Sequence, residues 1–141
     1  MSNILLLIVE DEALIAVSLE DALIGAGYDC VVTYSGQAAL DQLNEDAARF
    51  RGVLTDIRLG QGPGGWEVGQ RARELVPEIP VIYMSGDSAA DWPSKGVPNS
   101  LMIPKPYAYA QIITAISHMI NAAPNPMAAA TAAITPTKTP Q

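Results

Sequence analysis

Five short apolar runs recur along the chain, and segments with helical spacing of apolar residues separate them. The first run, residues 4–9, is continuously apolar, as expected of a strand that is buried on both faces. Strands that alternate with helices form a parallel sheet with helices on both faces, which is the α/β class. The predicted strands span residues 4–9, 30–34, 52–56, 80–84 and 100–103.

The segments between these runs carry signals for helix starts and ends. Ser35 is a residue type that caps helices, Gly27 favours helix termination, and Pro93 interrupts a helical pattern. The predicted helices span residues 12–26, from 35 onward, 66–75 and 107–121, with a poor fourth helix at 88–95. Their apolar stripes are Ile15, Leu19, Ala22, Leu23 and Ala26 in the first, Ala39, Leu40 and Leu43 in the second, and Ile112, Ile116, Met119 and Ile120 in the last.

The composition predicts one globular domain with a short extension. Of the 141 residues, 49% are hydrophobic and 16% are charged, which is typical of a globular rather than a disordered chain. We expect residues 1–121 to form the domain. Residues 122–141 are rich in Ala, Pro and Thr, and we expect them to be a flexible extension without a core of its own.

Charge and hydropathy disfavour several classes of protein. The run at residues 4–9 is too short to span a bilayer and follows no basic segment, so we expect neither a membrane span nor a signal peptide. The single cysteine, Cys30, can form no internal disulfide, which makes the cytoplasm the default location. A net charge of −7 argues against binding to nucleic acid and suits a site that recruits a divalent cation.

Polar side chains stand where the predicted strands end. Glu10 and Asp11 follow the first strand, Asp56 ends the third, Ser85 follows the fourth, and Lys105 follows the fifth. Because the carboxyl ends of the strands form the working edge of an open parallel sheet, these side chains should meet. Neighbouring carboxylates repel one another unless a cation neutralises them, and an all-oxygen site suits Mg²⁺. The lysine would add a positive charge for a phosphoryl group, and the serine a hydroxyl donor.

Each of these residues also has a simpler interpretation. Taken alone, Asp11 fits a helix cap, Asp56 a solvated loop acid, Lys105 a surface lysine and Ser85 a turn serine. The presence of all of them at strand ends favours a joint site over four unrelated residues. Three further residues are predicted to lie outside the site: His118 as a surface histidine, and Trp66 and Trp92 as packing residues.

Four motifs follow one another on the matching predicted strands: residues 9–12 (Val-Glu-Asp-Glu), 54–57 (Leu-Thr-Asp-Ile), 84–86 (Met-Ser-Gly) and 104–106 (Pro-Lys-Pro). Together they resemble the signatures of response-regulator receiver domains of two-component signalling, over about residues 3–121. Each motif alone is weak, but four in order are specific. The resemblance implies a flavodoxin-like (βα)₅ fold, a doubly wound parallel sheet of five strands in the order 2-1-3-4-5.

The resemblance also implies a role for each site residue. Asp56 would be the nucleophile that accepts a phosphoryl group from a histidine kinase or a histidine phosphotransfer protein. Asp11, Asp56 and the backbone carbonyl of Arg58 would bind Mg²⁺ directly, and Glu10 would act through a metal-bound water. The residues that would contact the phosphoryl oxygens are Ser85 and Lys105.

The sequence departs from the family pattern near the site. The family usually has Tyr or Phe three residues before the lysine, where this chain has Met102, so we expect activation to change the order of residues 85–95 instead. Residues 83–87 (Tyr-Met-Ser-Gly-Asp) resemble a subclass whose fourth strand ends in Phe-Ala-Thr-Gly-Tyr, with Asp87 in place of the final tyrosine. Arg58 and Asp87 should flank the mouth of the pocket, either as an ion pair across it or as two solvated charges.

These features favour a single-domain phosphorylation switch that acts on an unidentified downstream protein or serves as a phosphate sink. Such a switch is not a turnover enzyme, although it catalyses its own phosphoryl transfer and slow dephosphorylation. A phosphatase of the haloacid-dehalogenase type would need an aspartate two residues after Asp56, where this chain has Arg58. A pseudo-receiver would lack the complete acid–Asp–Ser–Lys set, and a flavin- or nucleotide-binding protein would have a glycine loop after the first strand.

Overall fold

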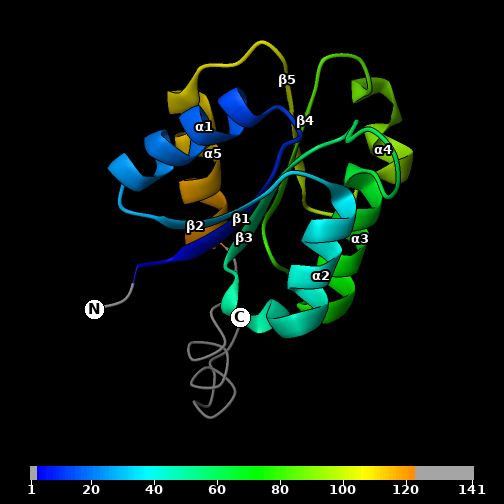
Figure 1. Ribbon diagram of the computed structural model, residues 1–141, viewed down its shortest axis with the longest axis horizontal. Helices are drawn as coiled ribbons and strands as arrows, with labels where there is room; N and C mark the ends of the chain where they lie inside the picture. The colour runs from blue at the N-terminus through cyan, green and yellow to red at the C-terminus, as the bar shows by residue number, and fades with distance from the viewer. Residues whose placement is uncertain (1–2, 123–141) are drawn as a thin grey trace, which may run out of the picture.

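The computed structural model describes residues 3–122, which form a five-stranded parallel sheet with helices on both faces (Figure 1). The strands lie in the order β2-β1-β3-β4-β5, so the predicted doubly wound, flavodoxin-like fold is confirmed. The strands are β1 (Leu5–Val9), β2 (Asp29–Thr33), β3 (Gly52–Asp56), β4 (Val81–Ser85) and β5 (Leu101–Pro104).

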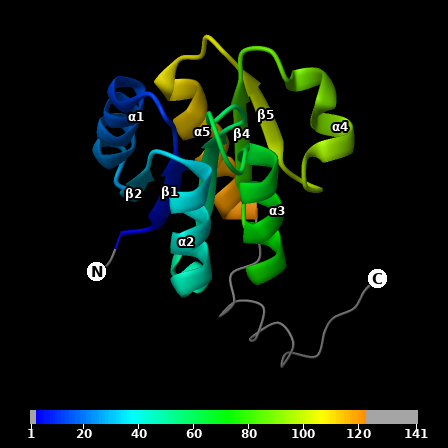
Figure 2. The ribbon, with the colours of Figure 1, turned by 45° about the vertical axis from the view of Figure 1, so that its right-hand side comes forward.

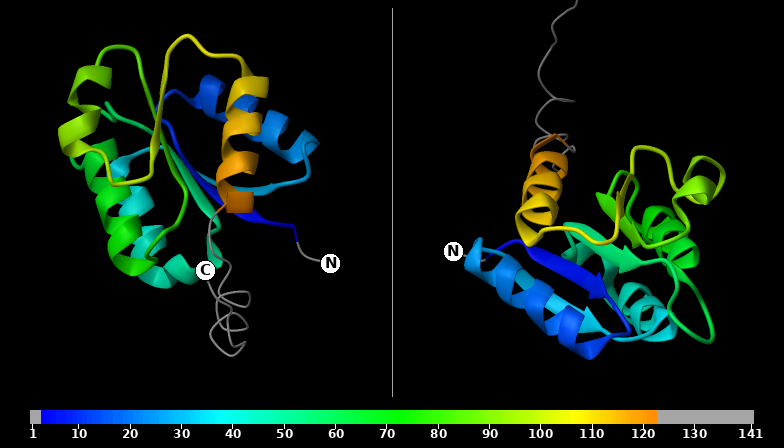
Figure 3. Two further views of the ribbon diagram at one scale, coloured as in Figure 1. Left: turned by 180° about the vertical axis from the view of Figure 1, so that it is seen from behind. Right: turned by 90° about the horizontal axis from the view of Figure 1, so that it is seen from above.

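Two longer helices cover each face of the sheet (Figures 1 and 3). On one face α1 (Ala13–Gly25) lies beside α5 (Tyr109–Ala122), and on the other α2 (Gly36–Asp46) lies beside α3 (Gly65–Leu75). Figure 2 shows the short α4 (Trp92–Lys95) on the β5 side of the molecule. Two 3₁₀ turns are η1 (Ala47–Arg49) and η2 (Ala89–Asp91). Among the residues that the structure describes, no helix has the length and hydropathy needed to cross a membrane.

The sheet separates two apolar cores, which explains why the first apolar run is continuous. In β1, Leu7 and Val9 belong to the core under α2 and α3, whereas Leu6 and Ile8 belong to the core under α1 and α5. All four side chains are fully buried. A strand covered on both faces excludes polar side chains from both, so the sequence pattern follows directly from the layer arrangement.

The ends of several strands differ by one residue from the prediction. The strand β4 ends at Ser85, which the sequence had placed just beyond the strand. Backbone pairing extends to this residue because Ser85 lies opposite Pro104 of β5 and its carbonyl accepts a hydrogen bond from the amide of Lys105 at 2.8 Å. The serine side chain therefore stands on the rigid end of a strand rather than in a loop.

The predicted helix ends are partly confirmed. The Ser35 side chain caps α2 by accepting a hydrogen bond from the amide of Ala38 at 3.1 Å. The prediction that Ala26 continues the apolar stripe of α1 is wrong, because α1 ends at Gly25 and Ala26 is exposed. Ala26 is the C-cap residue of α1, and Gly27, which follows it with a φ of +101°, turns the chain away from the helix axis.

The interpretation of Pro93 as a helix interruption is also corrected. The chain forms η2 and then one turn of α4, and Pro93 lies in the first turn of α4. A proline there is tolerated because the first amides of a helix have no acceptor within it. The fourth helix is nevertheless short, as the sequence predicted. At the other end, α5 includes Ala122, and the rest of the predicted extension, residues 123–141, lies outside the described residues.

Two helical glycines offer a direct test of packing between α3 and β4. A Cβ atom at Gly69 would lie 2.2 Å from the hydroxyl of the buried Tyr83, whereas a Cβ at Gly25 would meet nothing within 4 Å. We expect Gly69→Ala to lower the free energy of unfolding by about 1–3 kcal/mol through overpacking. Gly25→Ala should leave stability unchanged or raise it by up to about 1 kcal/mol. Urea denaturation of both variants checks this, and equal effects would contradict the packing described.

Candidate functional site

The sheet brings the predicted site residues together at the carboxyl ends of four neighbouring strands. Glu10 and Asp11 follow β1, Asp56 ends β3, Ser85 ends β4, and Lys105 follows β5. A hollow of about 370 Å³ opens at this edge, with Asp56 and Lys105 in its lining. Its other lining residues are Asp11, Glu12, Arg58, Ser85, Gly86 and Asp87.

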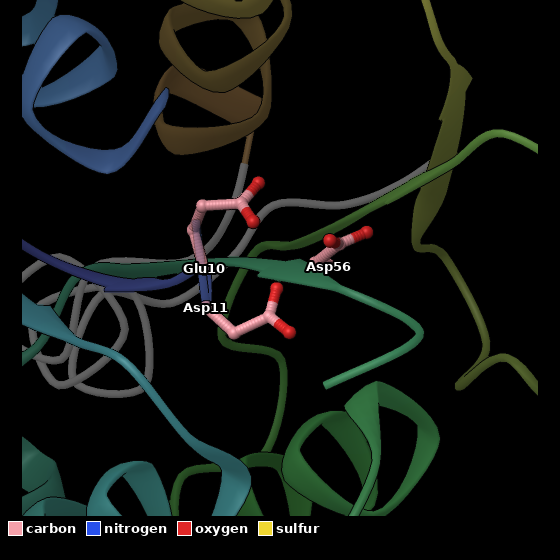
Figure 4. Close-up of side chains that lie close together, drawn as sticks. All are labelled: Glu10, Asp11 and Asp56. Carbon is pink, nitrogen blue, oxygen red and sulfur yellow. The ribbon is translucent and has the colours of Figure 1, made fainter. Parts of the chain in front are cut away.

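Three carboxylates form the acidic part of the site (Figure 4). Oxygen atoms of Glu10, Asp11 and Asp56 lie within 4.8 Å of one another, so one divalent ion can contact all three directly or through water. The side chain of Asp11 is exposed, whereas Asp56 is only 7% exposed and Glu10 is fully buried. The site thus has one solvent-facing carboxylate at its mouth and two that are enclosed.

Lys105 provides the positive charge opposite these carboxylates. Its Nζ lies 3.0 Å from Oδ2 of Asp56 and 3.4 Å from Oε1 of Glu10, and it donates a hydrogen bond to each. One ammonium therefore serves two enclosed carboxylates. Glu10 receives a second hydrogen bond at its other oxygen, from the amide of Glu12 at 3.1 Å.

Burial sets the ionisation of this cluster. It raises the pKa of Glu10 to about 7, with the charge of Asp56 adding to the effect and the Glu12 amide and Lys105 opposing it. Burial also raises the pKa of Asp56, against the hydrogen bond and charge of Lys105. Burial acts to lower the pKa of Lys105, but its contacts with Asp56 and Glu10 outweigh this and raise the pKa. A bound cation would relieve the repulsion that remains between the carboxylates.

The backbone fixes Asp56 in place. Its Oδ1 accepts a hydrogen bond from the amide of Ile57 at 3.1 Å, and the hydroxyl of the preceding Thr55 donates to its carbonyl at 2.8 Å. The chain returns close to this carbonyl at the start of α3, where a Cβ at Gly65 would lie only 2.1 Å from it. Glycine at position 65 is therefore a steric requirement of the loop after the acid.

Ser85 is held by the turn that follows it. Its Oγ accepts hydrogen bonds from the amides of Ser88 at 2.7 Å and Asp87 at 3.1 Å. The hydroxyl proton faces Oδ1 of Asp87 at 3.5 Å, a long and weak contact. Ser85 is almost fully buried. Because its contact with Asp87 is weak, its hydroxyl can donate a hydrogen bond to a stronger acceptor in the hollow.

Of the two alternatives for Arg58 and Asp87, the structure has the ion pair across the mouth. Nε of Arg58 lies 2.9 Å from Oδ2 of Asp87, and both side chains are exposed. The Ser88 hydroxyl donates a further hydrogen bond to the same carboxylate at 2.9 Å. The hydrogen bond from Arg58 is the main cause that lowers the pKa of Asp87, so this carboxylate stays ionised. The pair links the loop after β3 to the loop after β4.

The simpler interpretations are now decided for several residues. The helix-cap interpretation of Asp11 is wrong, because Glu12 occupies the N-cap position of α1. His118 is exposed on α5, as predicted for a surface histidine. The indole N–H of Trp92 donates to Oγ of Ser100, and the ring of Trp66 packs 4.8 Å from that of a buried tyrosine, so both tryptophans are packing residues.

Two residues near the site were not predicted from the sequence. Ser88 is buried, and its amide and hydroxyl both join the Ser85–Asp87 turn. A hydroxyl residue three positions beyond Ser85 is a weak sequence signal for such a turn. Tyr83 is fully buried on β4, two residues before Ser85, and the sequence placed it in the strand and in the 83–87 motif but indicated no contact of its own.

Comparison with known proteins assigns the class of this fold and site. The family model of the response regulator receiver domain matches residues 6–117, so the chain belongs to that family. Receiver domains accept a phosphoryl group in two-component signalling and bind Mg²⁺ at their acidic site, and the acidic cluster found here fits that ion. The predicted cofactor is thereby confirmed for the family.

Individual relatives are similar over the same region. The chain is 33% identical over 117 residues to the DNA-binding transcriptional regulator NtrC of Klebsiella pneumoniae, covering 79% of this chain and 24% of that protein. It is 33% identical over 89 residues to the transcriptional regulatory protein ZraR of Escherichia coli K12, covering 63% and 20%. The chain thus spans a quarter or less of the length of these relatives.

Solved structures agree with the fold. A response regulator receiver protein from Sinorhizobium medicae WSM419 has a TM-score of 0.83 and 41% identity, covering 86% of this chain and 97% of that one. The receiver domain of sensor histidine kinase PA1611 from Pseudomonas aeruginosa PAO1 has a TM-score of 0.73 and 18% identity, covering 85% and 99%. That domain has a magnesium ion coordinated in its active-site cleft.

The position of Asp11 leads to a prediction about metal binding. Asp11→Ala removes one of the three clustered carboxylates, and because Mg²⁺ takes few protein ligands we expect it to weaken Mg²⁺ binding by about tenfold or more. Titration calorimetry on chelator-treated protein measures this. Asp41→Ala is the matched control, because Asp41 is an exposed acid on α2. Within the part of the chain that the structure describes, its side chain accepts a hydrogen bond from Gln37 alone. An unchanged affinity in Asp11→Ala would contradict the role given to this residue.

Proposed function

We propose that this chain is a phosphorylation switch in which Asp56 accepts a phosphoryl group from a histidine kinase or a histidine phosphotransfer protein. The observation that supports this most strongly is the environment of the Asp56 carboxylate. It opens onto the hollow at the sheet edge, lies 3.0 Å from the ammonium of Lys105, and has Glu10 and Asp11 close enough to share a cation.

In the proposed reaction, an oxygen of Asp56 attacks the phosphorus of the donor's phosphohistidine. The new O–P bond forms as the P–N bond breaks, and the imidazole nitrogen keeps the electron pair. Lys105, which already contacts Oδ2, is placed to donate a hydrogen bond to a negatively charged phosphoryl oxygen. The Ser85 hydroxyl can donate a hydrogen bond to a second phosphoryl oxygen. Bound Mg²⁺ would neutralise phosphoryl and carboxylate charge, as divalent ions do in phosphoryl transfer.

The residues proposed to hold Mg²⁺ are Asp11, Asp56 and the backbone carbonyl of Arg58, with Glu10 acting through a metal-bound water. The loop that contains Arg58 passes close to the exposed carboxylate of Asp11, because a Cβ at Gly60 would lie 3.9 Å from its Oδ2. Glu10 is fully buried and already engaged by Lys105 and the Glu12 amide, which suits an indirect role.

A protein donor also needs a surface beside the nucleophile. A second hollow of about 420 Å³ shares Lys105 with the acidic one and is lined by Ile15, Pro106, Tyr107 and Tyr109. Leu14, in the first turn of α1, is 81% exposed. We propose that this apolar surface contacts the donor, and that output passes through a further protein or through phosphate loss rather than through nucleic acid, given the net charge of −7. A cytoplasmic location stays a prediction.

The test of the proposed function is direct labelling of Asp56. Incubation with acetyl phosphate and Mg²⁺ should add one phosphoryl group to the intact protein, seen by mass spectrometry, because small donors need no docking surface. Asp56→Asn should take up none, since it has no nucleophilic oxygen anion, and chelation of Mg²⁺ should abolish labelling.

The control for this test is Asp41→Asn, an exposed acid on α2 remote from the hollow, which should label like the wild type. Labelling of Asp56→Asn to the wild-type extent would show that another residue is modified. The assignment of Asp56 would then be wrong, whatever the fold.

The ion pair at the mouth leads to a prediction about how long the phosphoryl group persists. Arg58 and Asp87 span the entrance, so their pairing should hinder an attacking water. Arg58→Ala and Asp87→Ala should each shorten the lifetime, by at most roughly fivefold because an exposed pair is weak. The double variant should be no worse than either single one, since the pair is already broken. Decay of the phosphorylated mass after donor removal measures the lifetimes, and fully additive losses would mean that the two residues act separately.

A further inference from the structure

Tyr83 makes contacts that the proposed phosphorylation chemistry does not use. It is fully buried, and burial raises the pKa of its hydroxyl, which therefore stays protonated. The hydroxyl accepts a hydrogen bond at 3.2 Å from the amide of Val97, in the segment between α4 and β5. Gly69 of α3 makes room for it, since any Cβ there would clash with the tyrosine hydroxyl. A helical glycine costs about 1 kcal/mol relative to alanine, so this position is adapted to the hydroxyl.

Tyr83 and Ser85 stand on the same face of β4, because side chains two residues apart in a strand point the same way. Ser85 holds the start of the next segment through the amides of Asp87 and Ser88. Tyr83 holds its end through the amide of Val97. Residues 86–96 are thus a strap whose two ends are both attached to one strand.

The strap itself is weakly held. Of residues 86–96, only Ser88 is buried, and the regular structure consists of η2 and the single turn of α4. Its half-buried Trp92 donates to Oγ of Ser100, which in turn donates to the carbonyl of Val97. The far anchor is therefore a small network around Val97, with Tyr83 on one side and Ser100 on the other. Segments with few buried contacts open at low free energy, whereas their anchors do not.

We infer that Tyr83 is a positioning residue that limits the conformational change at its far end by holding Val97 to β4. When a phosphoryl oxygen accepts a hydrogen bond from the Ser85 hydroxyl, residues 86–96 rearrange and Val97 stays in place. This inference rests on the proposed function, since it needs a phosphoryl group at Asp56. Met102, at the position where the family usually has an aromatic residue, lies opposite Tyr83 on β5 and packs in the same core. The aromatic ring of Tyr83 therefore lies beside that position on the neighbouring strand.

The test uses Tyr83→Phe, which removes the hydroxyl and keeps the ring. Amide exchange by nuclear magnetic resonance is measured with Mg²⁺ alone and with Mg²⁺ and beryllofluoride, a phosphoryl mimic. In the wild type, beryllofluoride should change exchange within residues 86–96 and leave Val97 protected. In Tyr83→Phe, Val97 should exchange roughly fivefold faster, as expected for loss of one neutral hydrogen bond, and the beryllofluoride response should extend past residue 96 into residues 97–100.

Tyr28→Phe is the matched control, because it removes a tyrosine hydroxyl that bonds Ser117 in the opposite core. It should respond like the wild type. Acetyl phosphate labelling of Tyr83→Phe at the wild-type rate verifies that the variant is folded and its site intact.

Three outcomes would overturn the inference. If Val97 exchange is unchanged in Tyr83→Phe, the hydroxyl is no anchor. If Val97 exchanges faster but equally in both states, with the response still ending at residue 96, the hydroxyl only supports the fold. If the wild type neither labels nor responds to beryllofluoride, the proposed function fails and the inference with it, so the two failures are distinguishable.

Discussion

Two enclosed carboxylates sharing one ammonium are the constraint on which the rest of this structure depends. Glu10 and Asp56 are almost without solvent, and Lys105 reaches both. Burying unpaired charge is costly, so the arrangement persists only if the backbone holds all three groups in register. The parallel sheet does this, because β1, β3 and β5 end at the same edge and the Lys105 amide bonds the Ser85 carbonyl of β4. Burial is the main cause that raises the pKa of Glu10 to about 7, and the charge of Asp56 adds to it, so a bound cation would stabilise the ionised cluster.

The sequence predicted the fold, and it predicted which side chains meet at the sheet edge, because both depend on strong, local signals. Short continuous apolar runs are typical of strands covered on both faces, and polar residues at the carboxyl ends of parallel strands collect at one edge. Boundaries were less predictable, because Ser85 is kept in β4 by pairing with another strand and the helix ends one residue before Ala26 at the turn through Gly27. The motif resemblance, not the pattern, supplied the strand order. Ser88 and Tyr83 escaped prediction because their roles arise from a turn and from a space left by a glycine on a different helix.

The two sides of the site differ in how firmly they are built. Glu10, Asp56 and the half-buried Lys105 are charged and mutually bonded, so their positions are fixed by electrostatics as well as by the sheet. On the β4 side, Ser85 is held by two amides and a long contact to Asp87, whose carboxylate is exposed. A phosphoryl group adds about −1.5 to −2 charge. It would therefore meet firmly held charged groups and, on β4, a hydroxyl whose contact with Asp87 is long and easily exchanged.

The Arg58–Asp87 pair also connects the loop after Asp56 with the weakly held hydroxyl of Ser85. Asp87 accepts from Arg58, from Ser88 and weakly from Ser85, so one carboxylate joins the loop after the nucleophile to the start of the 86–96 strap. An incoming phosphoryl group competes with Asp87 for the Ser85 proton and for the nearby positive charge of Arg58. As an exposed pair, it offers little resistance to that competition. The ion pair at the mouth is thus weak enough to yield to a phosphoryl group, while the Val97 anchor beyond the strap is buried and does not line the hollow.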